Sequence, residues 1–523
     1  MNQLPPELYV EIGEFLQGPG FDRPLLATIS RQWQAAVERQ TFSEIRVKST
    51  DLDRFRDIVL NHRRRYVTKI NYVVVLPAYG DGERCSFERK NDRQANNKVF
   101  TAAVHRLFSL LKSWDGHKDG YISLCLEDIY STSDHPFLRY SSLSHEPLAV
   151  HFANRDDGDN ELLDLWAWRF HYSYLRLRRA SELPDVPVIS SFSTCITTRI
   201  MSTRVHIDIV AKLPNLRIAT LGLGEWDIRY LAVRRMQRHN LAQALTEVFP
   251  RSSALESLSL NMGEVYFWAP TFSAGTLNLG DSTNDELGSA IRTATGGMAN
   301  LKYLAVAGPI DATLLWPGPS HALREPYWQN LECLEVTFSA RRPSGGSYFR
   351  HNEQVPAPLE TEMPPGYGDS EEDDAVAAES FNPREHRDIR FALPMTPDDD
   401  SLEPLIEAFG RACSQMPRLR VACLSTVLSA SEAEVKSGRC MRNHNQFVWG
   451  VWYFSPYVQP TDGYDHLDPA VFEDINRRRL FWNLRDWRPD PALRSLLQSL
   501  GRERWGSDLV EKFFEVPQQD GSE

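Results

Sequence analysis

A short leucine pattern recurs along this chain, each time between a stretch with helical periodicity and a run that predicts a β-strand. Its form is L-x-x-L-x-L/V. The first leucine is expected to pack where the strand begins, and the next two to point inward from alternate strand positions. Helices that alternate with strands predict a parallel sheet with helices packed on it. The copies are Leu213–Leu221, Ala254–Leu260, Asn300–Val306, Asn330–Val336 and Pro417–Leu424.

The same alternation begins earlier in the chain without the leucine pattern. Leu52, Phe55 and Val59 predict a helix, and the β-branched run Val67–Leu76 predicts a strand covered on both faces. A second helix is predicted from about Asn97, followed by a strand over Tyr121–Glu127. One such unit cannot bury its apolar face alone, so the units are expected to stack on each other.

The pattern resembles the leucine-rich repeat family in a divergent form, with long and unequal spacings. This resemblance implies an irregular α/β solenoid with a parallel sheet. An ordinary α/β sheet without true repeats is the alternative, because the period is poor.

The first part of the chain predicts two short amphipathic helices. Pro5 and Pro6 suit the first turn of a helix, and Gly18–Gly20 would end it. Asp22 is a plausible N-cap for the second helix, with Pro24 in its first turn. The two apolar stripes are Leu8, Ile12, Phe15 and Leu16, and then Leu26, Ile29, Trp33 and Val37.

This segment resembles the F-box family in its L-P-x-E-L start, its paired leucines and Ser30-Arg31-x-Trp33. The family often has a cysteine where Ser30 stands. The resemblance implies a module that docks on the Skp adaptor of a cullin–RING ubiquitin ligase. A helical hairpin that merely caps the next domain is the alternative. The implied adaptor-binding residues are Leu4, Pro5, Leu8, Ile12, Leu16, Leu25, Leu26, Ile29 and Trp33.

Four regions are predicted. Residues 1–46 form the F-box-like helices and residues 47–340 the repeat-like α/β body. Residues 341–383 are expected to be a disordered, acidic, Pro-rich insertion outside the core, because they include Gly368–Asp374 and several prolines. Residues 384–523 contain the last repeat and an aromatic end, in which Phe447–Phe454 predicts a strand apolar on both faces. We interpret these aromatic residues as a cap of the core, with ligand binding as the alternative.

Composition narrows the functional classes. The net charge of −12 argues against nucleic-acid binding, and the runs Arg63–Arg65 and Arg477–Arg479 are interpreted as solvated surface. Seven dispersed cysteines fit a reducing compartment. The sequence shows neither a signal peptide nor a long apolar span, so we expect no membrane association and a soluble protein of the cytoplasm or nucleus.

No pattern of residues predicts a catalytic site, a cofactor or a metal. Gly222-x-Gly224 has Asp227 where a dinucleotide fingerprint needs glycine, so it is interpreted as a strand end. Cys440 and His444 have the spacing of two metal ligands but no second pair. Asp398–Asp400 precede a predicted helix and are interpreted as its cap.

These features favour a non-enzymatic substrate receptor of an SCF-type (Skp–cullin–F-box) ubiquitin ligase. Its helices would bind the adaptor and, through it, the cullin, while the repeat body would hold an unidentified target protein. One alternative is an interaction scaffold that uses the same helices without ubiquitin transfer. An enzyme that these patterns do not reveal is the other.

Overall fold

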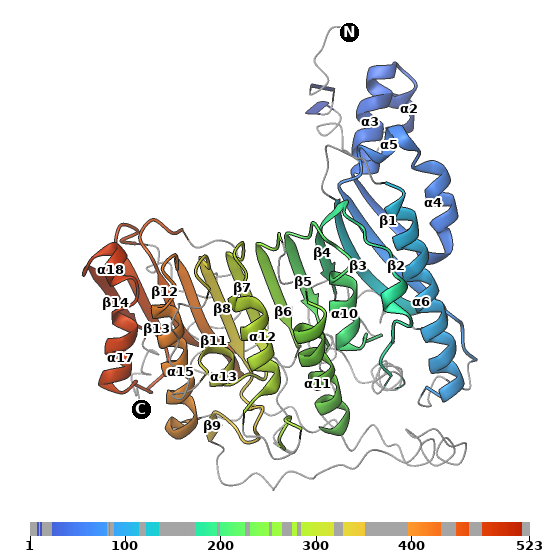
Figure 1. Ribbon diagram of the computed structural model, residues 1–523. Helices are drawn as coiled ribbons and strands as arrows, with labels where there is room; N and C mark the ends of the chain where they lie inside the picture. The colour runs from blue at the N-terminus through green and yellow to red at the C-terminus, as the bar shows by residue number, and fades with distance from the viewer. Residues whose placement is uncertain are drawn as a thin grey trace, which may run out of the picture.

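The fold is mixed α/β and is built around a large, mostly parallel sheet (Figure 1). The computed structural model describes residues 8–9, 11–12, 23–80, 83, 88–114, 122–134, 169, 173–195, 199–224, 231–249, 254–263, 275–279, 284–317, 328–350, 396–429, 446–459 and 473–514. Leu4, Pro5, Leu16, Cys440, His444 and the acidic run Gly368–Asp374 therefore lie outside the described residues.

The main sheet has 12 strands, and their order in space is their order along the chain. Neighbouring strands are parallel from the first strand to the ninth. The tenth strand is antiparallel to both of its neighbours. The strands are β1 (Glu44–Lys48), β2 (Lys69–Leu76), β3 (Ile122–Ser131), β4 (Ile189–Thr194), β5 (Ile218–Gly222), β6 (Ser257–Asn261), β7 (Tyr303–Gly308), β8 (Cys333–Phe338), β11 (Val421–Ser429), β12 (Gln446–Phe454), β13 (Arg478–Asn483) and β14 (Leu509–Phe513).

Helices connect the parallel strands and cover one face of the sheet (Figure 1). In the part of the chain that is described, no helix has both the length and the apolar character needed to cross a membrane. The helices are α2 (Arg23–Ala27), α3 (Arg31–Ser43), α4 (Leu52–Ile58), α5 (Asn61–Arg64), α6 (Lys90–Lys112), α10 (Thr203–Val210), α11 (Leu231–Glu247), α12 (Glu286–Gly296), α13 (Ala312–Leu315), α15 (Asp399–Ser414), α17 (Pro491–Gln498) and α18 (Arg502–Trp505).

The leucine pattern accounts for the core beneath these helices. All five copies end in strands of the main sheet. In β7, the inward residues Leu304 and Val306 are each 1% exposed, whereas Tyr303 and Ala305 point to the other face and are partly exposed. Leu301, the first leucine of this copy, is also 1% exposed. The predicted alternation is therefore confirmed, and one hydrophobic core runs under the sheet from Val47 to Leu500.

A row of alternating charges follows the amino-terminal edge of the sheet. In the main sheet, the residue directly before each of β5, β6, β7, β8 and β11 is charged, and its sign changes from one strand to the next. Arg217 and Lys302 flank Glu256, with N···O distances of 2.6 and 3.3 Å. Glu332 and Arg420 continue the row at 3.7 Å. Opposite charges on neighbouring strands favour this register over a shifted one.

Aromatic side chains fill both faces of the sheet at its carboxy-terminal end. Trp449 and Trp482 belong to the core on the helix side. Trp452 and Phe481 belong to a second hydrophobic cluster and are 0% and 1% exposed. The prediction that Phe447–Phe454 is apolar on both faces is confirmed.

The interpretation of the second arginine run as solvated surface is wrong for two of its residues. Arg478 and Arg479 lie in β13 and are 1% and 0% exposed. Arg478 donates hydrogen bonds to the backbone carbonyls of Gln498 and Leu500, at 2.9 and 2.7 Å. Carbonyl oxygens that become available only in the folded chain make this burial possible.

The predicted insertion begins later than residue 341. Tyr348 and Phe349 are each 1% exposed, and Phe349 begins the short strand β9 (Phe349–Arg350), which pairs with β10 (Thr396–Pro397). The Tyr348 hydroxyl donates a 2.9 Å hydrogen bond to the carbonyl of Ile310. Residues 341–350 are therefore packed on the core, because two large aromatic side chains compensate for the turn-rich sequence around them.

Candidate docking surface

The N-terminal helices form a small unit that projects beyond the sheet (Figure 1). The sequence pattern predicts one helix after Asp22, but the structure has two, α2 and α3, separated at Thr28–Ser30. Ser30 ends the break because its hydroxyl accepts a 3.2 Å hydrogen bond from the Trp33 backbone N–H. A serine in extended conformation at this position is a favourable N-cap, which outweighs the continuous apolar stripe.

A separate hydrophobic cluster holds this unit together. The rings of Tyr9 and Trp33 meet edge to face, with centroids 5.2 Å apart and planes at 86°. They are 2% and 8% exposed, and Ala36 and Leu26 pack with them. Sequence reasoning missed Tyr9. It directly follows Leu8, so a helix places it away from the apolar stripe, and an aromatic residue there indicates a second buried face.

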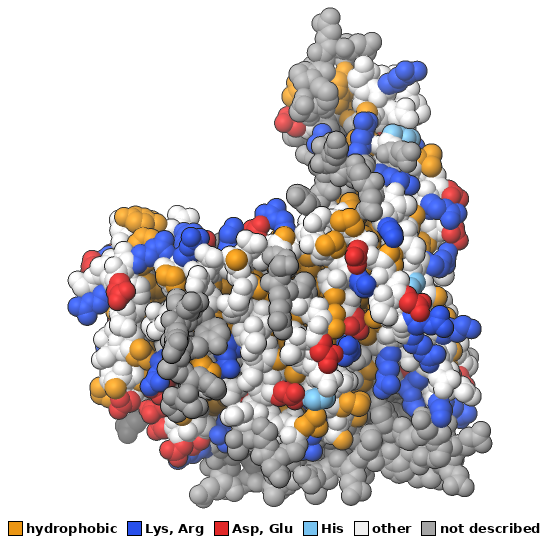
Figure 2. All heavy atoms as spheres, viewed as in Figure 1, with side chains coloured by type: hydrophobic (Ala, Val, Ile, Leu, Met, Phe, Trp, Pro, Cys, Tyr) orange, Lys and Arg blue, Asp and Glu red, His pale blue; other side chains and the backbone are white. Residues whose placement is uncertain are grey.

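Four of the predicted adaptor-binding residues are apolar and exposed. Leu8 and Ile12 are 38% and 37% exposed, and Leu25 and Ile29 are 66% and 60% exposed. We call these four residues the apolar docking residues. Figure 2 shows hydrophobic side chains at the surface of the projecting unit. Large exposed apolar side chains that occur together on one small unit are typical of protein-binding surfaces.

The other predicted residues have different positions. Trp33 is in the interior of the unit and Leu26 is only partly exposed, so these two residues support the surface from behind. Leu4, Pro5 and Leu16 are outside the described residues.

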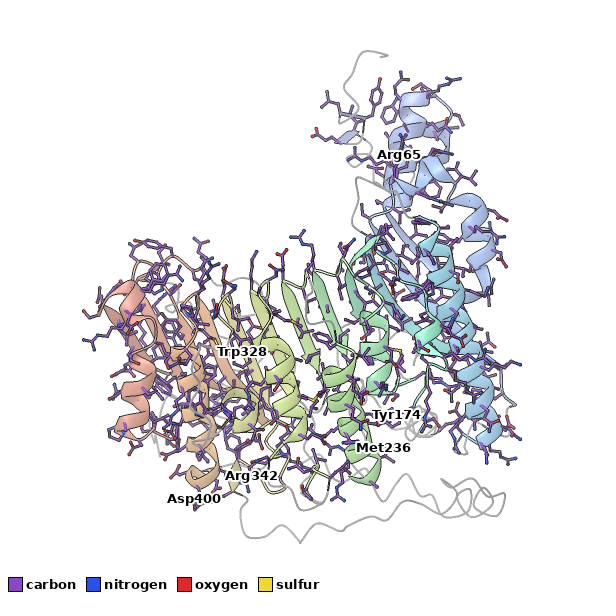
Figure 3. All side chains as sticks on the ribbon, viewed as in Figure 1. Arg65, Tyr174, Met236, Trp328, Arg342 and Asp400 are labelled. Atoms are coloured by element: carbon purple, nitrogen blue, oxygen red, sulfur yellow. The ribbon has the colours of Figure 1, made fainter. Side chains whose placement is uncertain are left out.

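Ion pairs and ring contacts connect the unit to the body. The Arg63 guanidinium is 2.8 Å from the Glu38 carboxylate and 4.9 Å from the centroid of the Phe42 ring. Burial alone would raise the pKa of Glu38, but the hydrogen bond and charge of Arg63 outweigh it and lower the pKa. Arg65, labelled in Figure 3, lies over the ring of its sequence neighbour Tyr66 at 4.8 Å. Within the arginine run, Arg63 therefore helps to fix the angle of the unit.

The face of the sheet that points away from the helices offers a second surface, which we call the open sheet face. Its central strands carry small polar side chains that are partly exposed, such as Ser193, Ser257 and Ser259. At its amino-terminal end, Arg46 reaches across β2 to Glu127 at 2.7 Å. Glu335 of β8 lies on the same face and accepts a 2.7 Å hydrogen bond from the Tyr303 hydroxyl. A surface of small polar side chains with a few charged ones suits contact with a protein.

Two thiols lie on this face beside each other. Cys125 pairs in register with Ser193, and Cys195 follows two residues later on the same strand edge. The hydrogen bond from Cys195 lowers the pKa of Cys125 to about 7, against the effect of burial. Both thiols are free.

Two other buried arginines, Arg199 and Arg238, are paired with buried carboxylates. Arg199 is 2.5 Å from Glu88 and 3.3 Å from Asp134. Arg238 is 2.9 Å from Asp285, whose side chain also caps α12 by accepting from the N–H groups of Leu287 and Gly288. Within the described ranges, no three metal-ligating side chains cluster in a way that could hold an ion.

Comparisons with known proteins add no family to these observations: no protein-family model and no curated protein sequence matches this chain.

Proposed function

We propose that this protein is the substrate-recognition subunit of an SCF-type ubiquitin ligase. The observation that carries the proposal is the exposure of Leu8, Ile12, Leu25 and Ile29 on a small helical unit that is joined firmly to a large body. The F-box-like order of residues in this unit indicates the proposed partner, which is a Skp-type adaptor and, through it, a cullin–RING ligase. The chain would supply proximity between target and ligase, and the ubiquitin-conjugating partner would supply the chemistry.

The α/β body is, in this proposal, an irregular solenoid of leucine-rich-repeat type. Support comes from the sequential order of parallel strands and from the helices on a single face of the sheet. Stacked units of this kind offer extended surfaces for binding proteins. The open sheet face would hold the target.

Paired charge substitutions test adaptor docking. We expect Leu25→Asp with Ile29→Asp to weaken binding of the Skp adaptor at least about 30-fold, because two carboxylates would lose water at the interface. The measurement is affinity purification, followed by a titration with purified adaptor. Met236→Asp with Leu279→Asp is the matched control, since both residues are 40–46% exposed. Figure 3 shows Met236 on α11, far from the projecting unit.

The outcomes separate the alternatives. Adaptor and cullin that co-purify with the wild type and the control, but not with the docking variant, support a ligase receptor. Adaptor without cullin supports the scaffold that does not transfer ubiquitin. Undiminished adaptor binding by the docking variant contradicts the proposed surface.

A further inference from the structure

Folding brings two basic segments together that are far apart in the sequence. The first is the amino-terminal half of α6, with Lys90 and Lys98. The second is Arg176–Arg179, which lies along this helix: the Asn97 amide oxygen accepts a 2.7 Å hydrogen bond from the backbone N–H of Arg176. Thr101 makes two further contacts with the same segment, accepting from the Arg178 N–H at 3.0 Å.

The cationic side chains of both segments are exposed. We call Lys98, Arg176 and Arg178 the basic patch. Figure 2 shows Lys and Arg side chains gathered over the lower part of α6. In Figure 3, the buried Tyr174 marks where the second segment approaches this helix.

The acidic residues nearby do not neutralise the patch. Asp92 pairs with the buried Arg169 at 3.0 Å, and Glu182 is 3.8 Å from Arg179. No carboxylate of a described residue is within ion-pair distance of Lys98, Arg176 or Arg178. The local positive charge is notable because the whole chain has a net charge of −12.

We propose that the basic patch binds an acidic, extended segment of a partner protein. A segment with several carboxylates could face Lys98 on α6 and the two arginines of the neighbouring segment. Such pairing gives orientation and a faster association rate.

Charge and size favour a protein partner over a nucleic acid. The affinity of a protein for nucleic acid comes largely from many contacts between cations and phosphates, and the patch has three cations. The acidic remainder of the surface would also repel a long polyanion. A short acidic peptide avoids both problems.

The test uses the purified full chain and a fluorescein-labelled octapeptide of alternating serine and glutamate. Fluorescence anisotropy measures its affinity. Lys98→Glu with Arg176→Glu and Arg178→Glu should weaken binding at least about tenfold. The side chains of Arg176 and Arg178 make none of the contacts with α6 described above, so these reversals should leave the packing intact. Raising the salt from about 50 to about 300 mM should weaken wild-type binding severalfold.

Arg54→Glu with Arg418→Glu and Arg502→Glu is the matched control, because it changes the net charge equally at exposed positions elsewhere. Its affinity should stay within about threefold of the wild type. Equal losses in both triple variants, with unchanged thermal midpoints, would overturn the proposal, since net charge alone would then explain binding. Displacement of the peptide by a single-stranded oligonucleotide at lower concentration than by unlabelled peptide would also overturn it.

The chain's own acidic run is a competing occupant. Replacing Asp369, Glu371, Glu372, Asp373 and Asp374 by serine leaves the peptide affinity unchanged if the patch is free for a partner. Binding that becomes tighter would show that this run occupies the patch, contrary to the proposal. The inference is independent of adaptor docking: the Leu25→Asp, Ile29→Asp variant should bind the peptide normally.

Discussion

Individual buried polar residues show how strongly the surroundings of a side chain change its ionisation. His206 of α10 is 1% exposed, and burial lowers its pKa to about 3. Its Nδ1 is 3.2 Å from the Thr194 hydroxyl, which also accepts from the N–H of Gly222. The imidazole is therefore held neutral between the helix and two strands.

We predict an acid-sensitive stability that depends on His206. The folded pKa lies below the unfolded value of about 6.5, so the stabilisation is complete above pH 6.5 and is lost as the pH falls toward 3. Between pH 7 and pH 5 the loss is about 2 kcal/mol. Urea unfolding at several pH values measures it. In His206→Gln, this decrease in the free energy of unfolding between pH 7 and pH 5 should disappear. An unchanged decrease would show that other groups cause it.

At the scale of single elements, local hydrogen bonds decide where helices begin, and charges decide how strands align. Ser30 begins α3, and Asp285 begins α12. In both cases a side-chain oxygen accepts from backbone N–H groups that the helix itself cannot satisfy. The sequence permits other caps, so only the folded backbone shows which cap is used.

The Ser30 cap gives a prediction for the docking unit. Ser30→Ala should destabilise α3 by about 1 kcal/mol, because the N–H of Trp33 loses its acceptor. Hydrogen exchange of the amides in Arg31–Ser43 measures the effect. Ser30→Asp is the matched control, since its carboxylate can also cap. Equal exchange in Ser30→Ala and the wild type would contradict a role for this cap.

The charge row along the sheet gives a second prediction. In Glu256→Lys, three cations would stand side by side with Arg217 and Lys302, so the thermal midpoint should fall slightly. Salt at about 1 M should remove most of the difference, because these residues are at the surface. Inverting the whole row, with Arg217→Glu, Lys302→Glu, Glu332→Lys and Arg420→Glu in the same chain, restores alternation and should recover the midpoint. A loss that persists after restoration would have another cause than charge.

At the scale of the whole molecule, the hydrophobic residues fall into separate clusters. The main core continues under the sheet from Val47 to Leu500, whereas Tyr9, Trp33 and Ala36 form their own small cluster. The N-terminal unit is joined to the body mainly through α3, α5 and β1. This arrangement suits a docking module that is held in a defined direction by a stable body.

Separate clusters predict separate effects of core mutations. Leu304→Ala should destabilise the body by about 2–5 kcal/mol, because it leaves a cavity under the sheet. Trp33→Ala should leave the main thermal transition unchanged while weakening adaptor binding and increasing exchange in α3. Ser259→Ala on the open sheet face is the control, with a change within about 0.5 kcal/mol. A shift of the main transition in Trp33→Ala would show that the two clusters unfold together.

The sequence alone determined the α/β class of the fold and its mostly parallel sheet. The leucine pattern is periodic, and each copy carries the residues that its own strand buries, so Leu255, Leu301 and Leu331 reveal their roles locally. The apolar residues that the structure exposes on the N-terminal unit could also be found, because they follow helical spacing within a few turns. Trp33 could be found too, but its position inside the unit could not, since that depends on the contact with Tyr9.

Only the tertiary structure decided the features that depend on residues distant in the chain. From the sequence, Arg478 and Arg479 are expected at the surface. They are buried because the folded chain provides backbone carbonyls that accept their hydrogen bonds. The sequence places Tyr348 in the insertion, whereas in the structure its hydroxyl donates a hydrogen bond to the carbonyl of Ile310. The basic patch exists because two segments almost eighty residues apart lie side by side, joined by Asn97 and Arg176. Such contacts produce no periodic pattern in the sequence, because each depends on two residues that are distant in the chain and that only folding brings together.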